Sequence, residues 1–205
     1  YYNLNEGSGQ IAGDSSGNNK NGNLGQNSTV EPIDPIWATG KTGTGLAFDG
    51  VNDLVTIVDT GGFDGPSMTQ LTVSAWANLN NLSGNRAVIG KSTTSFTLLV
   101  GTSNNWQFIM TGCSINAAAN TATIGSWHMI TATFNSSTSC RLYLDGAQVA
   151  STTTGVGASV PDTASPVFIG TVSGAAGFIN ATIDDARIYN VALSASEIQA
   201  LYNQG

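Results

Sequence analysis

The segment Leu71-Thr72-Val73-Ser74-Ala75-Trp76-Ala77 decides the class of fold, because apolar side chains recur at every second position from Leu71 onward. Successive side chains of a β-strand point to opposite faces of a sheet, so this alternation is typical of a strand buried on one face. The segment 128–134 repeats the pattern, with Ile130, Ala132 and Phe134 on one face. Both segments therefore predict strands that line a hydrophobic core.

Similar short runs continue along the chain, separated by turn residues. The segment 141–144 leads into Asp145-Gly146, a pair typical of a tight hairpin, and 148–150 returns. Further predicted strands lie at residues 54–57, 87–90, 96–100, 106–110, 167–170 and 178–189. The segments 14–30, 60–70 and 151–166 are rich in Gly, Ser, Thr, Asn and Pro and are predicted loops. About a dozen strands joined in this way predict an all-β sandwich of two antiparallel sheets.

Only one segment predicts a helix. Ser194 and Glu197 have the spacing of a capping box, and Ile198, Leu201 and Tyr202 follow at helical spacing. We therefore expect one short helix near residues 195–202. No linker-like segment and no internal repeat divides the chain, so we expect residues 1–205 to form a single domain.

The charge composition narrows the classes of partner. Charged residues make up 9% of the 205 residues, and six Lys and Arg against 13 Asp and Glu give a net charge of -7. So few cations cannot build the basic surface that nucleic acids or anionic lipids attract. No apolar run approaches the roughly 20 residues of a membrane helix. We expect neither nucleic-acid binding nor membrane insertion. Because the chain opens at Tyr1 rather than Met, we expect an excised domain or a mature product.

A series of short phrases carries a family resemblance. They are NEGSG (5–9), DSSGN (14–18), GK (40–41), GLAFDGVND (45–53), TVSAW (72–76), GSWH (125–128), LYLDG (142–146), IDDARIYN (183–190) and ALS (192–194). Their order and spacing resemble the laminin-G-like, concanavalin A-like family of bacterial extracellular domains. The resemblance implies a jelly-roll sandwich of two curved antiparallel sheets, and a secreted or cell-surface location in a bacterium.

The resemblance leaves several functions open, because this fold hosts lectins, adhesion domains, glycosidases and lyases. Our leading hypothesis is a non-catalytic carbohydrate-binding module with a polysaccharide ligand, covalently linked to other domains of an exported protein. The first alternative is an adhesion or structural module that binds protein or spaces other domains. The second alternative is a small enzyme.

Few residues are suited to acid–base catalysis. Glycosidases generally need two facing carboxylates, but the only glutamates are Glu6, Glu31 and Glu197, none of them on a central predicted strand. Adjacent carboxylates such as Asp184 and Asp185 point to opposite faces of a strand. The single histidine, His128, follows a tryptophan at a position common in the resembled family. We therefore expect no enzymatic activity.

The resemblance also implies one structural Ca²⁺ between the N-terminal loop and the last strand. Hard oxygen ligands suit calcium. Asp184 is the central candidate, because it shares a predicted face with two apolar residues and a buried carboxylate needs a partner. The alternative is that Asp184 pairs with Arg187 or caps backbone amides. The predicted ligand set is Glu6, Asp14, Asn18, Asp49 and Asp184.

Candidate sugar-binding residues lie in two predicted loops. Aromatic rings stack on sugar faces and amides bond hydroxyl groups. Trp106 follows Asn104-Asn105 at a loop exit, whereas the other tryptophans are assigned to packing. The predicted ligand-binding residues are Trp106, Asn78, Asn80, Asn81, Asn85 and Arg86. The alternative for the 78–86 segment is an ordinary solvated loop.

Cys113 and Cys140 are the only two cysteines. An even pair in an exported domain predicts a disulfide, here between the ends of neighbouring strands. The alternative is a pair of buried thiols.

Overall fold

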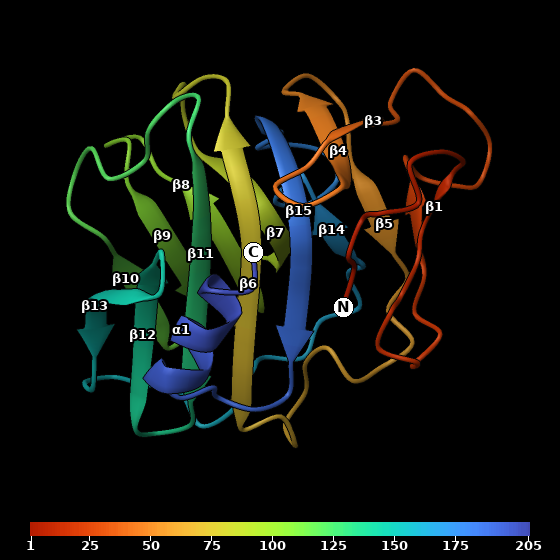
Figure 1. The fold of residues 1–205 in the computed structure, drawn as a ribbon. Helices are drawn as coiled ribbons and strands as arrows, with labels where there is room; N and C mark the ends of the chain where they lie inside the picture. Colours follow the sequence, from red (N-terminus) through yellow and green to blue (C-terminus); the bar gives the residue numbers. More distant parts are fainter.

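The computed structural model describes residues 1–205 and shows two antiparallel β-sheets packed face to face (Figure 1). This confirms the predicted all-β sandwich. Alternation explains the packing, since Leu71, Val73 and Ala75 on one sheet are completely buried, as are Ile130, Ala132 and Phe134. These side chains meet those of the other sheet in one continuous hydrophobic core.

The first sheet has seven strands in the order β13-β12-β11-β6-β15-β4-β3. Its long central strands, which include the segment that decided the fold class, carry the candidate face described below. The strands are β3 (Ile36–Thr39), β4 (Thr44–Asp49), β6 (Gln70–Leu79), β11 (Trp127–Asn135), β12 (Ser139–Leu144), β13 (Ala147–Thr152) and β15 (Asn180–Tyr189).

The second sheet has eight strands in the order β1-β2-β5-β14-β7-β8-β9-β10. They are β1 (Ile11–Ala12), β2 (Gly22–Leu24), β5 (Val55–Ile57), β7 (Arg86–Ser92), β8 (Phe96–Val100), β9 (Trp106–Met110), β10 (Cys113–Asn116) and β14 (Val167–Ile169). The prediction of a loop over 14–30 is wrong at β2. Such short strands form through pairing with distant segments, here β2 with β5, and leave little periodicity in the sequence.

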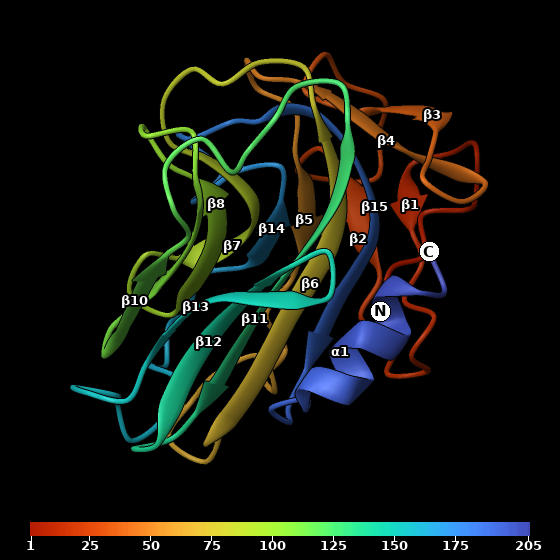
Figure 2. The same ribbon diagram turned by 60° about the vertical axis from the view of Figure 1, so that its left-hand side comes forward.

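The single helix, α1 (Ala195–Tyr202), begins at the predicted capping box. The Ser194 side chain accepts a hydrogen bond from the backbone N–H of Glu197, and the Glu197 carboxylate accepts one from the backbone N–H of Ser194. Figure 2 shows α1 against the outer face of the seven-stranded sheet, on the side away from the other sheet. There Ile198 packs on Trp76, Met129 and Tyr143. This eight-residue helix is too short to cross a membrane, and the structure has no longer one.

Cys113 and Cys140 form a disulfide, as predicted. The prediction that it joins neighbouring strands is wrong, because Cys113 lies on β10 of the eight-stranded sheet and Cys140 on β12 of the seven-stranded sheet. The bond therefore links the two sheets through the core. A crosslink of this kind restricts the unfolded chain and stabilises the folded state by about 3 kcal/mol.

Candidate functional site: an open face of the seven-stranded sheet

The outer face of the seven-stranded sheet is covered in its lower half and open in its upper half in the view of Figure 1. The helix α1 covers the lower half. Above it, five strands contribute one side chain each to a continuous line, which we call the cross-strand row. The row consists of Ile36, Ala47, Thr182, Asn78 and Trp127.

The strand registers establish the row. Asn78 on β6 pairs with Thr182 on β15 and with Trp127 on β11, and paired residues share a face. The neighbours of Asn78 along β6, Ala77 and Leu79, are buried in the core, so Asn78 itself points outward. Ile36 at the far end is 69% exposed. The row thus combines an aromatic ring, an amide, a hydroxyl and aliphatic groups on an open surface.

A second set of amides borders the row at the upper edge of the sheet. The Asn80 side chain donates a hydrogen bond of 2.8 Å to Oδ1 of Asn180, and the Asn80 backbone N–H donates one to the Asn180 carbonyl. Next to them, the Oδ1 atom of Asn78 is buried and accepts no hydrogen bond. A buried polar atom usually has a partner, so the Asn78 amide lacks one of the hydrogen bonds that it could make.

A cavity of about 430 Å³ adjoins the row, and we call it the acidic pocket. It is lined by Pro32, Asp34, Ile36, Ala47, Phe48, Asp49, Asp53, Asn80 and Asn180. Three of these residues carry carboxylates and none carries a positive charge. Burial raises the pKa of Asp53 to about 6, and the neighbouring charges of Asp49 and Asp34 act in the same direction. The pocket is therefore a region of uncompensated negative charge beside the amides.

The structure places the predicted sugar-binding residues in different positions. Asn78 and Asn80 lie on or beside the row. Asn81 and Arg86 each hold one buried side-chain atom without a hydrogen-bond partner, and Asn85 is exposed. Asn81 and Asn85 lie in the connection to β7, and Arg86 is the first residue of β7, which belongs to the other sheet. Sequence reasoning missed Trp127, Thr182, Asn180 and Asp34, because only strand register brings them together.

The assignment of Trp106 to sugar binding is wrong. Trp106 is completely buried on β9, with Phe108 and Met110 on the same core-facing side. Its ring meets the edge of the His128 ring with centroids 6.5 Å apart. The signal was present in the sequence, because residues 106, 108 and 110 alternate as core positions do. A ring without an exposed face cannot stack on a sugar.

The five predicted calcium ligands do not converge on one point, and no group of three or more acidic, histidine or cysteine side chains is placed to hold a metal. Glu6 accepts a hydrogen bond from the Gly13 N–H, and Asp49 accepts one from the Val51 N–H. Asp14 and Asn18 share a loop near Lys20, where Ser16 and Lys20 N–H groups lower the pKa of Asp14 despite its burial. These contacts stabilise loops locally.

Asp184 differs from the other four candidates. The prediction that it faces inward is wrong, because it pairs with Trp76 on the outer face, and a bulge at Asp185 restores inward alternation at Ala186. Asp184 is nevertheless only 1% exposed, beneath the turn between β3 and β4, where the Thr42 N–H donates to its Oδ2. Burial raises its pKa to about 6. Arg187 pairs with Asp185 at 3.1 Å, not with Asp184. The Asp184 Oδ1 atom accepts the Asp185 N–H, so Asp184 caps backbone amides, which was the other alternative to a metal ligand.

The surroundings of Gly40 show which oxygen atoms lie near Asp184 and could bind a metal ion. A methyl group at Gly40 would lie 2.6 Å from Asp184 Oδ2 and would also contact the carbonyl oxygen of Thr44. Two oxygens, one of them a buried carboxylate without a cationic partner, thus lie close to the same glycine. Oxygen ligands of these two kinds suit Ca²⁺. Asp184 Oδ2 and the Thr44 carbonyl oxygen are therefore the two oxygens that this turn could offer to a cation, whereas the other four predicted residues lie apart from them.

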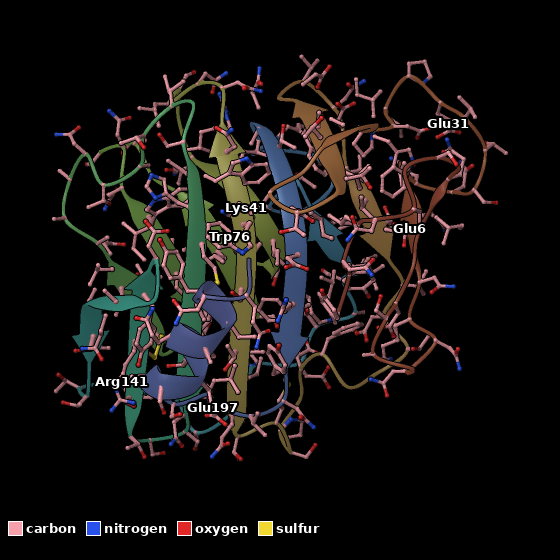
Figure 3. The ribbon with its side chains drawn as sticks, in the orientation of Figure 1. Glu6, Glu31, Lys41, Trp76, Arg141 and Glu197 are labelled. Atoms are coloured by element: carbon pink, nitrogen blue, oxygen red, sulfur yellow. A yellow bond between two sulfur atoms is a disulfide. The ribbon has the colours of Figure 1, made fainter.

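The glutamates form no pair. Figure 3 shows Glu6 and Glu31 on one side of the molecule and Glu197 at the bottom, with Lys41 and Trp76 between them at the centre. His128 makes two hydrogen bonds. Its Nδ1 lies 2.7 Å from Asp145 Oδ2, and its Nε2 lies 2.8 Å from Thr123 Oγ1. This chain joins the loop before β11 to the turn between β12 and β13.

The fold and the open face define a lectin-like β-sandwich, and the chain belongs to the concanavalin A-like lectin/glucanases superfamily. The family match, to its Laminin_G_3 member, covers residues 35–199. This confirms the resemblance on which the calcium and carbohydrate hypotheses were based. Comparison with curated proteins yields no match.

Three solved structures show the similarity of fold. The binding domain of Paraclostridial Mosquitocidal Protein 1 has a TM-score of 0.71 and 20% identity over 94% of this chain and 49% of that one. Domain 4 of AbnA, a GH43 extracellular arabinanase from Geobacillus stearothermophilus solved with arabinotriose, has a TM-score of 0.69 and 18% identity over 98% and 96%. Trypanosoma rangeli sialidase has a TM-score of 0.66 and 18% identity over 97% and 31%. The chain thus spans half or less of two of these relatives.

Proposed function

We propose that residues 1–205 form a non-catalytic carbohydrate-binding module of an exported multidomain protein, and that the glycan lies along the cross-strand row. The observation that carries the proposal is the row itself, because one partly exposed indole, aliphatic surface and several amides lie on one open face. Sugars present apolar ring faces and peripheral hydroxyl groups, and this combination of side chains complements both.

Similar proteins support the proposal. Domain 4 of the arabinanase was solved with arabinotriose, and it matches this chain over nearly its whole length. The mosquitocidal protein contributes a binding domain from a larger chain. Cys113 and Cys140 form a disulfide, and such a bond suits an extracellular location.

Isothermal titration against a panel of plant, algal and bacterial polysaccharides tests this function. We expect saturable binding that Asn80→Ala weakens, because it removes an amide beside the row. Asn85→Ala is the matched control, since Asn85 is an exposed asparagine of the same loop away from the row. Binding to a protein receptor and to no glycan would favour the adhesion alternative. Release of reducing sugar or of an unsaturated product, abolished by His128→Ala, would contradict the non-catalytic assignment.

We also propose one structural Ca²⁺ at Asp184. Its support is a buried carboxylate without a cationic partner, next to the Thr44 carbonyl oxygen. A bound cation there would connect the turn between β3 and β4 to β15 and would offset the cost of burying the carboxylate. Its role is to stabilise the fold, and no step of ligand binding depends on it.

A further inference from the structure

The acidic pocket has a charge that the protein itself does not balance. Asp34, Asp49 and Asp53 line it, and none of them takes part in an ion pair. The basic side chains are engaged or placed elsewhere. Lys91 pairs with Asp59, Arg187 pairs with Asp185, Lys41 lies over the Trp76 ring, Lys20 binds Thr60, Arg86 binds Ser83, and Arg141 lies at the bottom of the sheet in Figure 3.

The Asp53 carboxylate also has a free acceptor atom. Asp53 is only 7% exposed, and its Oδ2 accepts a hydrogen bond from the Asp49 N–H while its Oδ1 accepts none. Asp34 Oδ2 accepts a hydrogen bond from the Glu31 N–H, and its Oδ1 is shielded from solvent next to Gly25, so Asp34 contributes negative charge to the pocket rather than a free acceptor. A buried carboxylate oxygen without a donor is costly, and a charged donor would offset that cost more than a neutral one.

The shape of the pocket restricts the kind of donor. The three carboxylates do not gather around one point in the manner of metal ligands. They border a cavity of about 430 Å³, a volume within the usual range for small organic ligands. Ile36 and Ala47 form its apolar wall, and Asn80 and Asn180 supply amides. A sugar ring that carries an ammonium group matches this set, with the ring on the wall, hydroxyl groups on the amides and the cation toward the carboxylates.

We propose that the acidic pocket selects glycans whose sugars carry a free amino group, such as 2-amino-2-deoxy sugars, over their N-acetylated, neutral or anionic counterparts. The pocket shares Ile36 and Ala47 with the cross-strand row, so the selection rests on the proposed glycan-binding function. The carboxylates exclude uronic and sialic acids by charge repulsion. Asp34, Asp49 and Asp53 are the residues that determine this specificity.

The test compares four oligosaccharides of equal length by isothermal titration, in buffer with EDTA and at a pH where the sugar amine is protonated. Three of them are β-1,4-linked oligomers of glucosamine, N-acetylglucosamine and glucose. The fourth is an oligomer of galacturonate in its natural linkage. We expect the glucosamine oligomer to bind on the order of tenfold more tightly than the next, as a charge-assisted hydrogen bond implies. Added salt should reduce this preference, because it screens the ion pair.

Substitutions assign the preference to the pocket. Asp53→Asn and Asp34→Asn should remove the amine preference, so that the glucosamine and glucose oligomers bind each variant with similar affinity. Asp49 is exposed, so Asp49→Asn gives the same comparison if the variant at buried Asp53 or at half-buried Asp34 melts early. Asp162→Asn in an exposed loop is the control. Equal affinity for amino and neutral sugars, or a preference that survives these substitutions, would overturn the inference alone. Absence of binding to all four and to the wider polysaccharide panel would overturn the proposed function as well.

Discussion

Trp106 and Trp127 each begin a β-strand, yet their side chains have opposite environments. Trp106 opens β9 and lies in the core, completely buried, whereas Trp127 opens β11 and lies on the outer face with part of its ring exposed. The difference depends on which face of the sheet each residue occupies, because side chains two positions apart share a face. Phe108 lies in the core with Trp106, whereas Met129 lies on the outer face with Trp127. The side chain available to a ligand is therefore that of Trp127.

Replacing Trp106 tests this placement. Trp106→Ala should lower the free energy of unfolding by about 3–5 kcal/mol, because it leaves a large cavity in a close-packed core. Denaturant titration measures this change. In the fraction that remains folded, glycan affinity should equal that of the wild type. If the variant kept the stability of the wild type but lost glycan affinity, the result would instead support a role of Trp106 in sugar binding.

Burial of two carboxylates predicts how stability depends on pH. Burial raises the pKa of Asp53 and of Asp184 to about 6, above the ordinary aspartate value of 3.8. Between these values the folded state binds more protons than the unfolded state, so the free energy of unfolding increases as the pH falls from 7 toward 5. Hydrogen bonds lower the pKa of Asp14, and Lys91 lowers the pKa of Asp59. Protonation of these two carboxylates therefore changes the stability only at a pH below this range.

Melting temperatures in metal-free buffer measure this dependence. We expect the wild type to melt at a higher temperature at pH 5 than at pH 7, and Asp53→Asn to reduce the difference. Asp162→Asn, on an exposed loop, should leave the difference unchanged. A melting temperature that falls from pH 7 to pH 5 would contradict the uncompensated burial of these groups.

At the scale of elements, the long strands and the helix could be predicted because their signals are local. The alternation in β6 and β11 and the capping box at Ser194 each lie within a few residues. The bulge in β15 could not be predicted, because Asp185 adopts a φ of 50° only in the context of its neighbours β6 and β4. It reversed the expected direction of Asp184.

The candidate site was predicted only in part for a related reason. Asn78 and Asn80 were found because a polar cluster interrupts an apolar strand at that point. The remaining members of the row come from β3, β4, β11 and β15, and their juxtaposition depends on the register between strands that are distant in sequence. Residue types alone do not reveal which of them share a face.

The cap of α1 offers a test at this scale. Ser194→Ala removes the side-chain acceptor for the Glu197 N–H and should lower the free energy of unfolding by about 1 kcal/mol. Because α1 covers Trp76, Met129 and Tyr143, fluorescence of the tryptophans should report early fraying of the helix. Ser173→Ala, in an exposed loop, is the control. Equal stability of the two variants would show that the cap contributes nothing measurable.

At the scale of the whole molecule, one hydrophobic core and one disulfide connect the two sheets. We propose that residues 1–205 therefore unfold as a single cooperative unit. The proposed Ca²⁺ at Asp184 adds a connection between β15 and the turn before β4.

Chelation tests that calcium site. A ligand that binds only the folded state raises its stability, so EDTA should lower the melting temperature of calcium-loaded protein, and added Ca²⁺ should restore it. Asp184→Asn should not respond to either treatment, whereas Asp14→Asn should still respond, because Asp14 lies in a separate loop. Unchanged melting in EDTA, with no calcium by elemental analysis, would rule out the site.

The central claim, that the open face of the seven-stranded sheet binds glycan, is tested most directly by titrating the best-binding polysaccharide against a matched pair of variants at Trp127. We expect Trp127→Phe to keep most of the affinity, because it retains an aromatic ring. Trp127→Ala should lose about 1 kcal/mol or more of binding free energy, as aromatic contacts imply. Circular dichroism and melting temperature establish that both variants are folded. Equal and undiminished affinity of folded Trp127→Ala and Trp127→Phe would contradict the claim.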